Sequence, residues 1–437
     1  MKDTELENLM QYISESPTPY HAVQAQCGRL EAAGFRRLTE AQPWSLENGQ
    51  GYYVTRNESS LIAFRLPRQE AKRFMMTASH TDAPTLKLKD APELPAVNGV
   101  KRLNVEGYGS ALLMPWFDRP LGVAGRVAVR TPQGVELRLY ASGRPLAMIP
   151  SLAIHMDRDA NHGHDIVRQK ELVPLYGQTD APDLLAIVAE DLALRREDIL
   201  AHDLMLYNTE PPRVWGARDE FLSAEKLDDL ACAYASLAGF LAARECDSIP
   251  VHIVLDSEEI GSSTMQGACG TFVRDTLMRI AEVLGWSEQM YLTAVAESFM
   301  LSADNAHAAH PNHMDRADPV TYPRLNGGPV VKFSGAQTYA TDAVSAAVVR
   351  RAAELAGIEL QSFVNNSDVR GGRTLGNIFV QQVSAHTADV GIAQLAMHSP
   401  YETCGSADIA SLAALCRTIY STALCEEVPG RFTVSVS

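Results

Sequence analysis

The sequence predicts an α/β protein: a mostly parallel sheet flanked by helices forms the main domain, and a second, β-rich domain is inserted into it. Three observations predict this fold. Strand-like and helix-like segments alternate in both outer parts of the 437-residue chain, as they do in parallel sheets. The middle of the chain has the pattern of β-hairpins instead, and the alternation returns after Trp215. We therefore expect a main domain at residues 1–90 and 215–437 and an inserted domain at residues 91–214.

The first 90 residues begin with an acidic, helix-like stretch and continue as strands. The segment RFMMTASHTD (residues 73–82) is an apolar run that ends in polar residues. It predicts a buried strand whose end lies where open α/β sheets bind ligands. In the middle of the chain, GVAGRVAVRTPQGVELRLYASGRPLAMI places the turn residues 132–134 between two strand-like runs, which predicts a hairpin.

Beyond Trp215 the sequence predicts three helices and a buried strand. A helix at 229–245 with an apolar face is followed closely by a strand at 251–255. A second helix covers 339–357, and Gly357 is its expected C-cap. A third helix near the C-terminus is expected to begin with Ser406 as its N-cap. The sequence does not indicate the order of the strands in the sheet.

Composition and charge exclude several classes of function. The chain is 46% hydrophobic and 21% charged, as soluble globular proteins are, and its formal charge of −15 argues against a nucleic-acid partner. No apolar run approaches the roughly 18 residues of a membrane span, and the acidic N-terminus lacks the apolar core of a secretory signal. Seven cysteines without a CxxC pair fit the reducing cytoplasm, so any metal must be held by histidines and carboxylates.

The most informative motif is VHIVLDSEEIGS (residues 251–262), in which Glu258 and Glu259 follow an apolar strand. Neighbouring residues point to opposite sides of an extended strand, so the two carboxylates can share a site only where the chain curls. One carboxylate could then bind a metal while the other accepts a proton from water. The alternative is a solvated pair of glutamates in a loop, the commoner use of such residues.

Two further motifs contain residues suited to a metal site. His80 and Asp82 are two residues apart at a strand end, so both can face the same way, and an aspartate beside an imidazole orients it and raises its basicity. Asp228 precedes the helix at 229–245. It is either part of an acidic N-cap together with Asp229 or a carboxylate whose two oxygens bridge two metals.

Asp304 and His398 each follow an apolar segment and complete the candidate set. Asp304 is either a terminal ligand or a turn aspartate, and His398 is either a ligand or a core histidine. Three carboxylates, two neutral imidazoles and a bridging hydroxide carry a charge that balances two divalent cations. This thiol-free set suits zinc, cobalt or manganese and hydrolysis of an amide or ester. The ligands would be His80, Asp228, Glu259, Asp304 and His398, with Glu258 as base and Asp82 orienting His80.

A set of motifs in order along the chain closely resembles the aspartyl aminopeptidase family, a branch of the co-catalytic dizinc aminopeptidases. The resemblance runs from about residue 10 to residue 425. It rests on SHTD, KLDDLA, DSEEIGS, SADNAHAAHPNH, GGPVVKFSGAQTYATDAVS, NNSDVRGGRTLGN and QLAMHSPYE.

The resemblance implies a role for each candidate residue. His80 and Asp304 would hold one of two zinc ions per subunit, Glu259 and His398 the other, and Asp228 would bridge them. Glu258 would be the general base. The inserted domain would be a dimerisation domain, and the homo-oligomer would be a tetrahedral dodecamer.

The resemblance also implies which residues lie near the substrate. His155, in LAIHMDR, would reach the active site of a neighbouring subunit, and Lys332 and Tyr339 would lie beside the substrate. Arg370 and Arg373 are basic residues near the expected pocket without an assigned role. One departure from the family pattern is Tyr401, in SPYE, where many relatives have an arginine.

We therefore expect a cytoplasmic metallo-aminopeptidase that removes N-terminal Asp or Glu from peptides. Two alternatives differ from this expectation. The enzyme could prefer neutral or apolar N-terminal residues, as one branch of the family does. Alternatively, the chain could be a catalytically dead assembly protein, although the complete ligand set argues against that.

Overall fold

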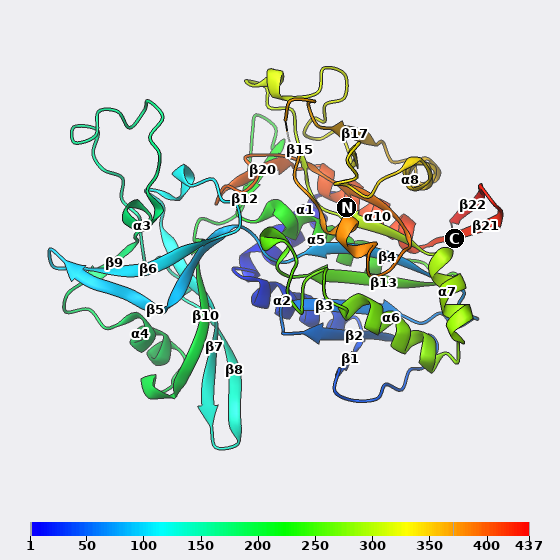
Figure 1. Cartoon of the computed structure of the whole chain (residues 1–437), viewed down its shortest axis with the longest axis horizontal. Helices are drawn as coiled ribbons and strands as arrows, with labels where there is room; N and C mark the ends of the chain where they lie inside the picture. The colour runs from blue at the N-terminus through cyan, green and yellow to red at the C-terminus, as the bar shows by residue number, and fades with distance from the viewer. Residues whose placement is uncertain (1, 370, 437) are drawn as a thin grey trace.

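A nine-stranded sheet forms the centre of the computed structural model, which describes residues 2–369 and 371–436 (Figure 1). Five of its eight strand pairings are parallel, which confirms the predicted α/β class with a mostly parallel sheet. In spatial order the strands are β1 (Arg36–Leu38), β2 (Gly51–Arg56), β3 (Ser60–Arg65), β13 (Ser248–Leu255), β4 (Arg73–His80), β14 (Phe299–Ala303), β18 (His386–Gly391), β16 (Val330–Phe333) and β17 (Gln361–Val364).

Helices cover both faces of this sheet, because successive residues of its strands point to opposite faces. Leu61 and Ala63 of β3 lie in one hydrophobic core, whereas Ile62 and Phe64 lie in the other. The first core contains residues of α1 (Lys2–Glu15), α2 (Pro19–Ala32), α5 (Leu227–Leu241), α8 (Ala343–Ala356) and α10 (Asp408–Tyr420). The second contains residues of α6 (Phe272–Val283), α7 (Glu288–Ala296) and α9 (Leu375–Phe379).

A six-stranded, wholly antiparallel sheet is built from residues between Thr85 and Asn208 and extends to the left of the main body in Figure 1. Its own hydrophobic core includes residues of helix α4 (Leu184–Asp191). The strands are, in spatial order, β8 (Gly134–Ala141), β7 (Leu121–Thr131), β10 (Ile199–Asn208), β5 (Thr85–Val97), β6 (Val100–Tyr108) and β9 (Leu175–Gln178); α3 (Arg168–Glu171), η1 (Met114–Trp116) and η2 (Arg196–Asp198) lie between them in the chain. The hairpin of β7 and β8 turns at residues 132–133, as predicted.

A smaller five-stranded sheet brings together segments far apart in the chain. It contains β12 (Phe221–Ala224), which leads into α5, and β20 (Glu402–Gly405), which leads toward α10. The other strands are β11 (Arg213–Trp215), β19 (Ala393–Leu395) and β15 (Ala306–His307), and a separate hairpin of β21 (Thr422–Val428) and β22 (Arg431–Val436) ends the chain. The short helices η3 (Glu258–Ile260) and η4 (Met314–Arg316) complete the elements.

The helix boundaries agree with the sequence in one case and differ in another. Gly357 is the C-cap of α8 in a left-handed conformation with φ of 67°, as expected for glycine at this position. The prediction that Ser406 caps α10 is wrong, because the N-cap is Ala407 and its side chain accepts no hydrogen bond. The Ser406 hydroxyl donates instead to the Asp219 carbonyl, 2.7 Å away.

Candidate metal centre

Three adjacent parallel strands end at the same edge of the large sheet and bring candidate residues together. His80 is the last residue of β4, Glu258 and Glu259 follow β13 in the turn η3, and Asp304 follows β14. Strands β4, β13 and β14 run parallel to one another. Parallel strands present their carboxyl ends at one edge, which is where such sheets bind ligands.

Asp228 and His398 reach this edge from outside the strands. Asp228 lies at the start of α5, where the backbone is not helical (φ −85°, ψ 104°), so its carboxylate is free to turn toward the sheet. His398 lies in the turn between β19 and β20 and has a positive φ of 68°. A left-handed backbone is unusual for residues other than glycine and commonly marks a functional site.

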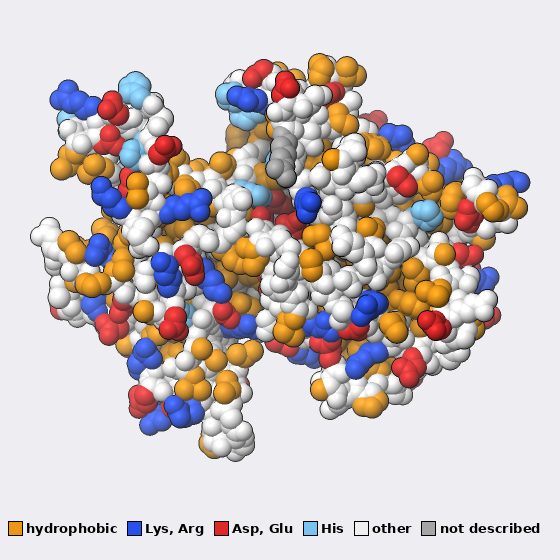
Figure 2. Space-filling view, in the orientation of Figure 1, with side chains coloured by type: hydrophobic (Ala, Val, Ile, Leu, Met, Phe, Trp, Pro, Cys, Tyr) orange, Lys and Arg blue, Asp and Glu red, His pale blue; other side chains and the backbone are white. Residues whose placement is uncertain are grey.

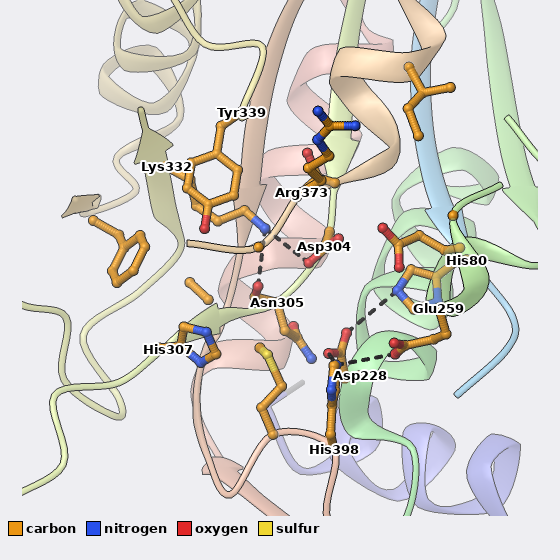
Figure 3. A pocket seen from close by; sticks show the side chains of 18 residues that line it. His80, Asp228, Glu259, Asp304, Asn305, His307, Lys332, Tyr339, Arg373 and His398 are labelled. Atoms are coloured by element: carbon orange, nitrogen blue, oxygen red, sulfur yellow. Dashed lines mark hydrogen bonds and ion pairs between the residues drawn. The ribbon is translucent and has the colours of Figure 1, made fainter. Parts of the chain in front are cut away.

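The two oxygens of Asp228 face two different imidazoles (Figure 3). Oδ1 lies 3.6 Å from Nε2 of His80, and Oδ2 lies 3.5 Å from Nε2 of His398. Glu259 Oε1 is 3.3 Å from the same nitrogen of His398. A carboxylate between two histidines, with one oxygen toward each, is the arrangement that a bridging ligand requires.

Two groups of donor atoms are close enough to bind a metal ion. In each, one atom per residue lies within 4.8 Å of the others: His80, Glu258 and Glu259 form one group, and Asp228, Glu259 and His398 form the other. Asp304 lines the same cavity, where its Oδ1 lies 2.9 Å from the ammonium nitrogen of Lys332. The structure therefore brings all five predicted ligands and the predicted base into one site.

Nδ1 is the ring nitrogen of each histidine that does not face Asp228, and in both rings it forms a hydrogen bond with a main-chain carbonyl. Nδ1 of His80 lies 3.0 Å from the Asp82 carbonyl oxygen, and Nδ1 of His398 lies 2.9 Å from that of Ser110. Because a carbonyl oxygen only accepts, Nδ1 carries the hydrogen in both rings. In the neutral form of each ring, the lone pair is then on Nε2, which faces the carboxylates, as a metal ligand needs.

The carboxylate of Asp82 has contacts that the sequence did not predict, whereas the hydrogen bond to Nδ1 of His80 involves the Asp82 main-chain carbonyl. Its carboxylate accepts the backbone N–H groups of Glu258 and Glu259, both at 3.1 Å, and the hydroxyl of Tyr108 at 2.8 Å. It is 3.5 Å from Nδ1 of His80. Asp82 therefore fixes the turn that carries both glutamates, in addition to its contact with His80.

The site concentrates negative charge in a buried place. Burial and the neighbouring carboxylates raise the pKa of Glu258 to about 8, and the same causes raise the pKa of Glu259 well above its usual range. Burial alone would lower the pKa of His398, but Asp228 and Glu259 outweigh it and raise this pKa to about 10. Such crowding of carboxylates favours a positive partner, because it disfavours their simultaneous ionisation.

Two buried carboxylate oxygens support a metal as that partner. Asp228 Oδ1 and Glu259 Oε1 have no hydrogen-bond donor among the residues that the structure describes. A buried carboxylate oxygen without a donor is costly, whereas coordination to a cation satisfies it. The donors are imidazoles and carboxylates, so the residues fit divalent ions such as zinc, cobalt or manganese.

A cavity of about 340 Å³ opens above these residues. In Figure 2, acidic side chains lie at the bottom of a hollow near the centre of the face shown. Lys332 of β16, Tyr339 and Arg373 line the cavity, and Arg373 is exposed. Lys332 is only 2% exposed, and its ammonium also donates to the Asn305 carbonyl at 3.1 Å. His307, which the sequence analysis did not single out, is a further lining residue.

Two of the remaining candidates are described by the structure and do not line the cavity. His155 is exposed, lies between β8 and α3, and does not line the cavity of its own chain. Arg370 falls outside the described residues. Tyr401 does not line the cavity: its hydroxyl donates to the Pro211 carbonyl at 3.1 Å, and the guanidinium of Arg119 lies 5.5 Å from its ring centre. The departure from the family pattern at Tyr401 therefore lies outside the cavity lining.

Comparisons with known proteins agree on one family. The family model described as aminopeptidase I zinc metalloprotease (M18) matches residues 12–420. A probable M18 family aminopeptidase 2 of Clostridium acetobutylicum is 40% identical over 411 residues, which cover 92% of this chain and 95% of the relative. A protein of Pseudomonas aeruginosa with the same description is 40% identical over 425 residues, 95% of this chain and 98% of the relative.

Solved structures have the same fold. The structure described as the Ape4 and Nbr1 complex matches with a TM-score of 0.92 and 33% identity, over 96% of this chain and 86% of that chain. The structure described as the mApe1 dodecamer of yeast matches with a TM-score of 0.83 and 27% identity, over 96% of this chain and 98% of that chain.

Proposed function

The chain belongs to the M18 family of zinc aminopeptidases, and from this premise we propose that it removes N-terminal Asp or Glu from peptides at a dinuclear zinc centre. The observation that carries the proposal is the position of Asp228, whose two oxygens face His80 and His398. We assign His80 and Asp304 to one ion, Glu259 and His398 to the other, and Asp228 to both. When bound, the two ions would polarise the scissile carbonyl and acidify a water molecule.

The residues of the chain supply the proton transfer and the orientation. Glu258 lines the cavity, and its raised pKa suits a group that takes a proton from the attacking water and gives it to the leaving amine. Asp82 holds the turn of Glu258 and Glu259 through their backbone N–H groups. Lys332 holds Asp304 in the cavity through a buried ion pair of 2.9 Å.

A preference for acidic residues requires local positive charge, because the chain as a whole carries −15. Lys332 and Arg373 are the lysine and arginine among the described residues that line the cavity. A charge-assisted contact of roughly 1.5–3 kcal/mol corresponds to about a 10–150-fold preference over an uncharged side chain. We therefore expect N-terminal Asp and Glu to be cleaved faster than Asn, Gln and Leu by such factors in kcat/KM.

Lys332→Met is expected to reduce this preference. The substitution removes a buried cation, and it also removes the partner of Asp304, so activity toward all substrates should fall. The ratio of kcat/KM for Asp to that for Asn corrects for the general loss, and it should decrease toward one. The same ratio is measured for Arg373→Met, which shows how much of the acidic preference depends on Lys332 and how much on Arg373. A wild-type enzyme that cleaves N-terminal Leu faster than Asp or Glu with the same metal would contradict the acidic preference.

We also propose that the chain acts as a homo-oligomer in a reducing compartment such as the cytoplasm. The yeast structure that it resembles is described as a dodecamer, and all seven cysteines here are free. Exposed apolar side chains surround His155 on the segment between β8 and α3, as expected of a contact surface; Leu152, Ile154 and Met156 are 59%, 47% and 75% exposed. No helix within residues 2–369 and 371–436 is long and apolar enough to cross a membrane.

His155→Ala tests whether this segment serves a neighbouring subunit. Turnover should fall while zinc content and assembly stay as in the wild type, since His155 does not line the cavity of its own chain. Mixing His155→Ala with Glu258→Gln chains should restore activity, because one site of a mixed pair receives both intact groups. Absence of recovery, with subunit exchange shown by mass spectrometry, would contradict action between subunits.

A further inference from the structure

The carboxylate of Glu402 joins the two segments that carry Asp228 and His398. Its Oε2 accepts the backbone N–H of Asp228 at 2.9 Å, and its Oε1 accepts the backbone N–H of His398 at 2.6 Å. Glu402 is the first residue of β20, is 1% exposed, and pairs with Ala224 of β12 just before the chain enters α5. One buried side chain therefore fixes the main chain at two candidate ligands that are far apart in sequence.

Both segments have backbones that need such support. His398 has a positive φ of 68°. Lys226, two residues before Asp228, has a positive φ of 53°. Left-handed conformations at residues other than glycine persist only where the surroundings hold them. Glu402 provides this support with the two oxygens of one side chain, each of which accepts one of the two backbone N–H groups.

The His398 turn is also held from the side of the six-stranded sheet. Leu112 donates its backbone N–H to the His398 carbonyl at 3.0 Å, the Ser110 carbonyl accepts from the imidazole, and Asn208 donates to the Pro400 carbonyl at 3.0 Å. These contacts fix the ring and one side of the turn. The bond to Glu402 fixes its other side relative to Asp228, so the separation of the two ligands depends on Glu402.

We propose that Glu402 is a positioning residue that sets the distance between Asp228 and His398 and thereby the zinc affinity of the centre. This inference rests on the proposed metal centre. Glu402 does not line the cavity above the centre, so it acts through the two ligands rather than on the substrate. Residues that orient metal ligands in this way typically contribute about 10–100-fold to metal affinity.

Glu402→Gln tests the proposal with a minimal change of shape. Glutamine offers one oxygen and one amide nitrogen in place of two oxygens, so one of the two N–H groups would face another donor. We expect the full-length protein to bind zinc about 10–100-fold more weakly, measured by competition with a chromogenic chelator. At saturating zinc, kcat should recover, and KM should stay close to the wild-type value.

Asp408→Asn is a matched control. Asp408 is also 1% exposed, and its two oxygens accept the backbone N–H groups of Gly328 at 2.9 Å and Asn326 at 2.7 Å. It has the same hydrogen-bonding role as Glu402, but neither of its partners is a candidate ligand. Asp408→Asn should lower thermal stability about as much as Glu402→Gln and leave zinc affinity unchanged.

Two results would overturn the role of Glu402. They are unchanged zinc affinity in Glu402→Gln, and equal losses of affinity in Glu402→Gln and Asp408→Asn, which would reflect general destabilisation. If Glu402→Gln does not fold, Glu402→Asp, whose shorter side chain cannot reach both N–H groups, is judged by the same two results. The readout is zinc binding, so a wild type that binds zinc without cleaving acidic peptides would overturn the proposed function alone.

Discussion

Glu258→Gln is expected to lower turnover by about 10²–10⁴-fold while the protein keeps its metal, because a positioned acid–base group is worth about that much. Glutamine has nearly the same shape as glutamate but cannot accept the proton of water. The backbone N–H of residue 258 still donates to Asp82, so the turn should keep its position. Steady-state kinetics on an N-terminal Asp substrate, with zinc measured by elemental analysis of the same samples, checks both parts.

The neighbouring substitution separates the roles of the two glutamates. Glu259→Gln should lose zinc, because Oε1 of Glu259 lies 3.3 Å from the Nε2 of His398 and belongs to the same donor group. Near wild-type turnover in Glu258→Gln, or loss of zinc in that variant and not in Glu259→Gln, would show that the roles are reversed or wrong.

Asp228→Asn is expected to have the broadest effect on metal content, lowering it from about two ions per chain to well below one. Asparagine keeps one oxygen and replaces the other with an amide nitrogen, which carries two hydrogens and cannot ligate a cation. Because Asp228 faces both histidines, either orientation of the amide removes one contact and the shared negative charge. Activity should fall with the metal and should not recover fully when zinc is added.

His398→Ala is the comparison for Asp228→Asn. It should remove one ion and leave the other, because we assign His398 to one ion alone, whereas the two oxygens of Asp228 face both histidines. Fully active wild-type enzyme that contains one ion or none would contradict the dinuclear proposal. Equal metal content in Asp228→Asn and His398→Ala would contradict a bridging role for Asp228.

The parts of the site that follow strands could be predicted from sequence. His80 and the Glu258–Glu259 pair follow apolar runs, and parallel strands end at one edge, so their proximity follows from the fold class. Asp228 was ambiguous, because an acidic residue at the start of a helix also stabilises the helix. The resemblance to a family, rather than any local pattern, assigned it a role.

The supporting contacts could not be predicted, because most of them use the main chain. The Ser110 carbonyl binds the imidazole of His398, and any residue type offers the same carbonyl. Glu402 and Tyr108 contribute side chains, but their partners are Asp82 and two backbone N–H groups distant in sequence. No spacing of residue types marks such contacts. The prediction that Ser406 caps α10 was wrong for a related reason: its hydroxyl donates to the carbonyl of Asp219, which belongs to a different segment.

The bond between Ser110 and His398 joins positions 288 residues apart, and that separation has a consequence for how the protein is completed. Closing a long loop costs entropy, and contacts of high sequence separation tend to form late in folding. The segment that carries Ser110 follows β6 of the six-stranded sheet, so we expect His398 to form this hydrogen bond after that sheet has formed. We therefore expect the imidazole of His398 to be oriented in the last stages of folding. Bound zinc would then indicate that the Ser110 segment and the His398 turn have both reached their native positions.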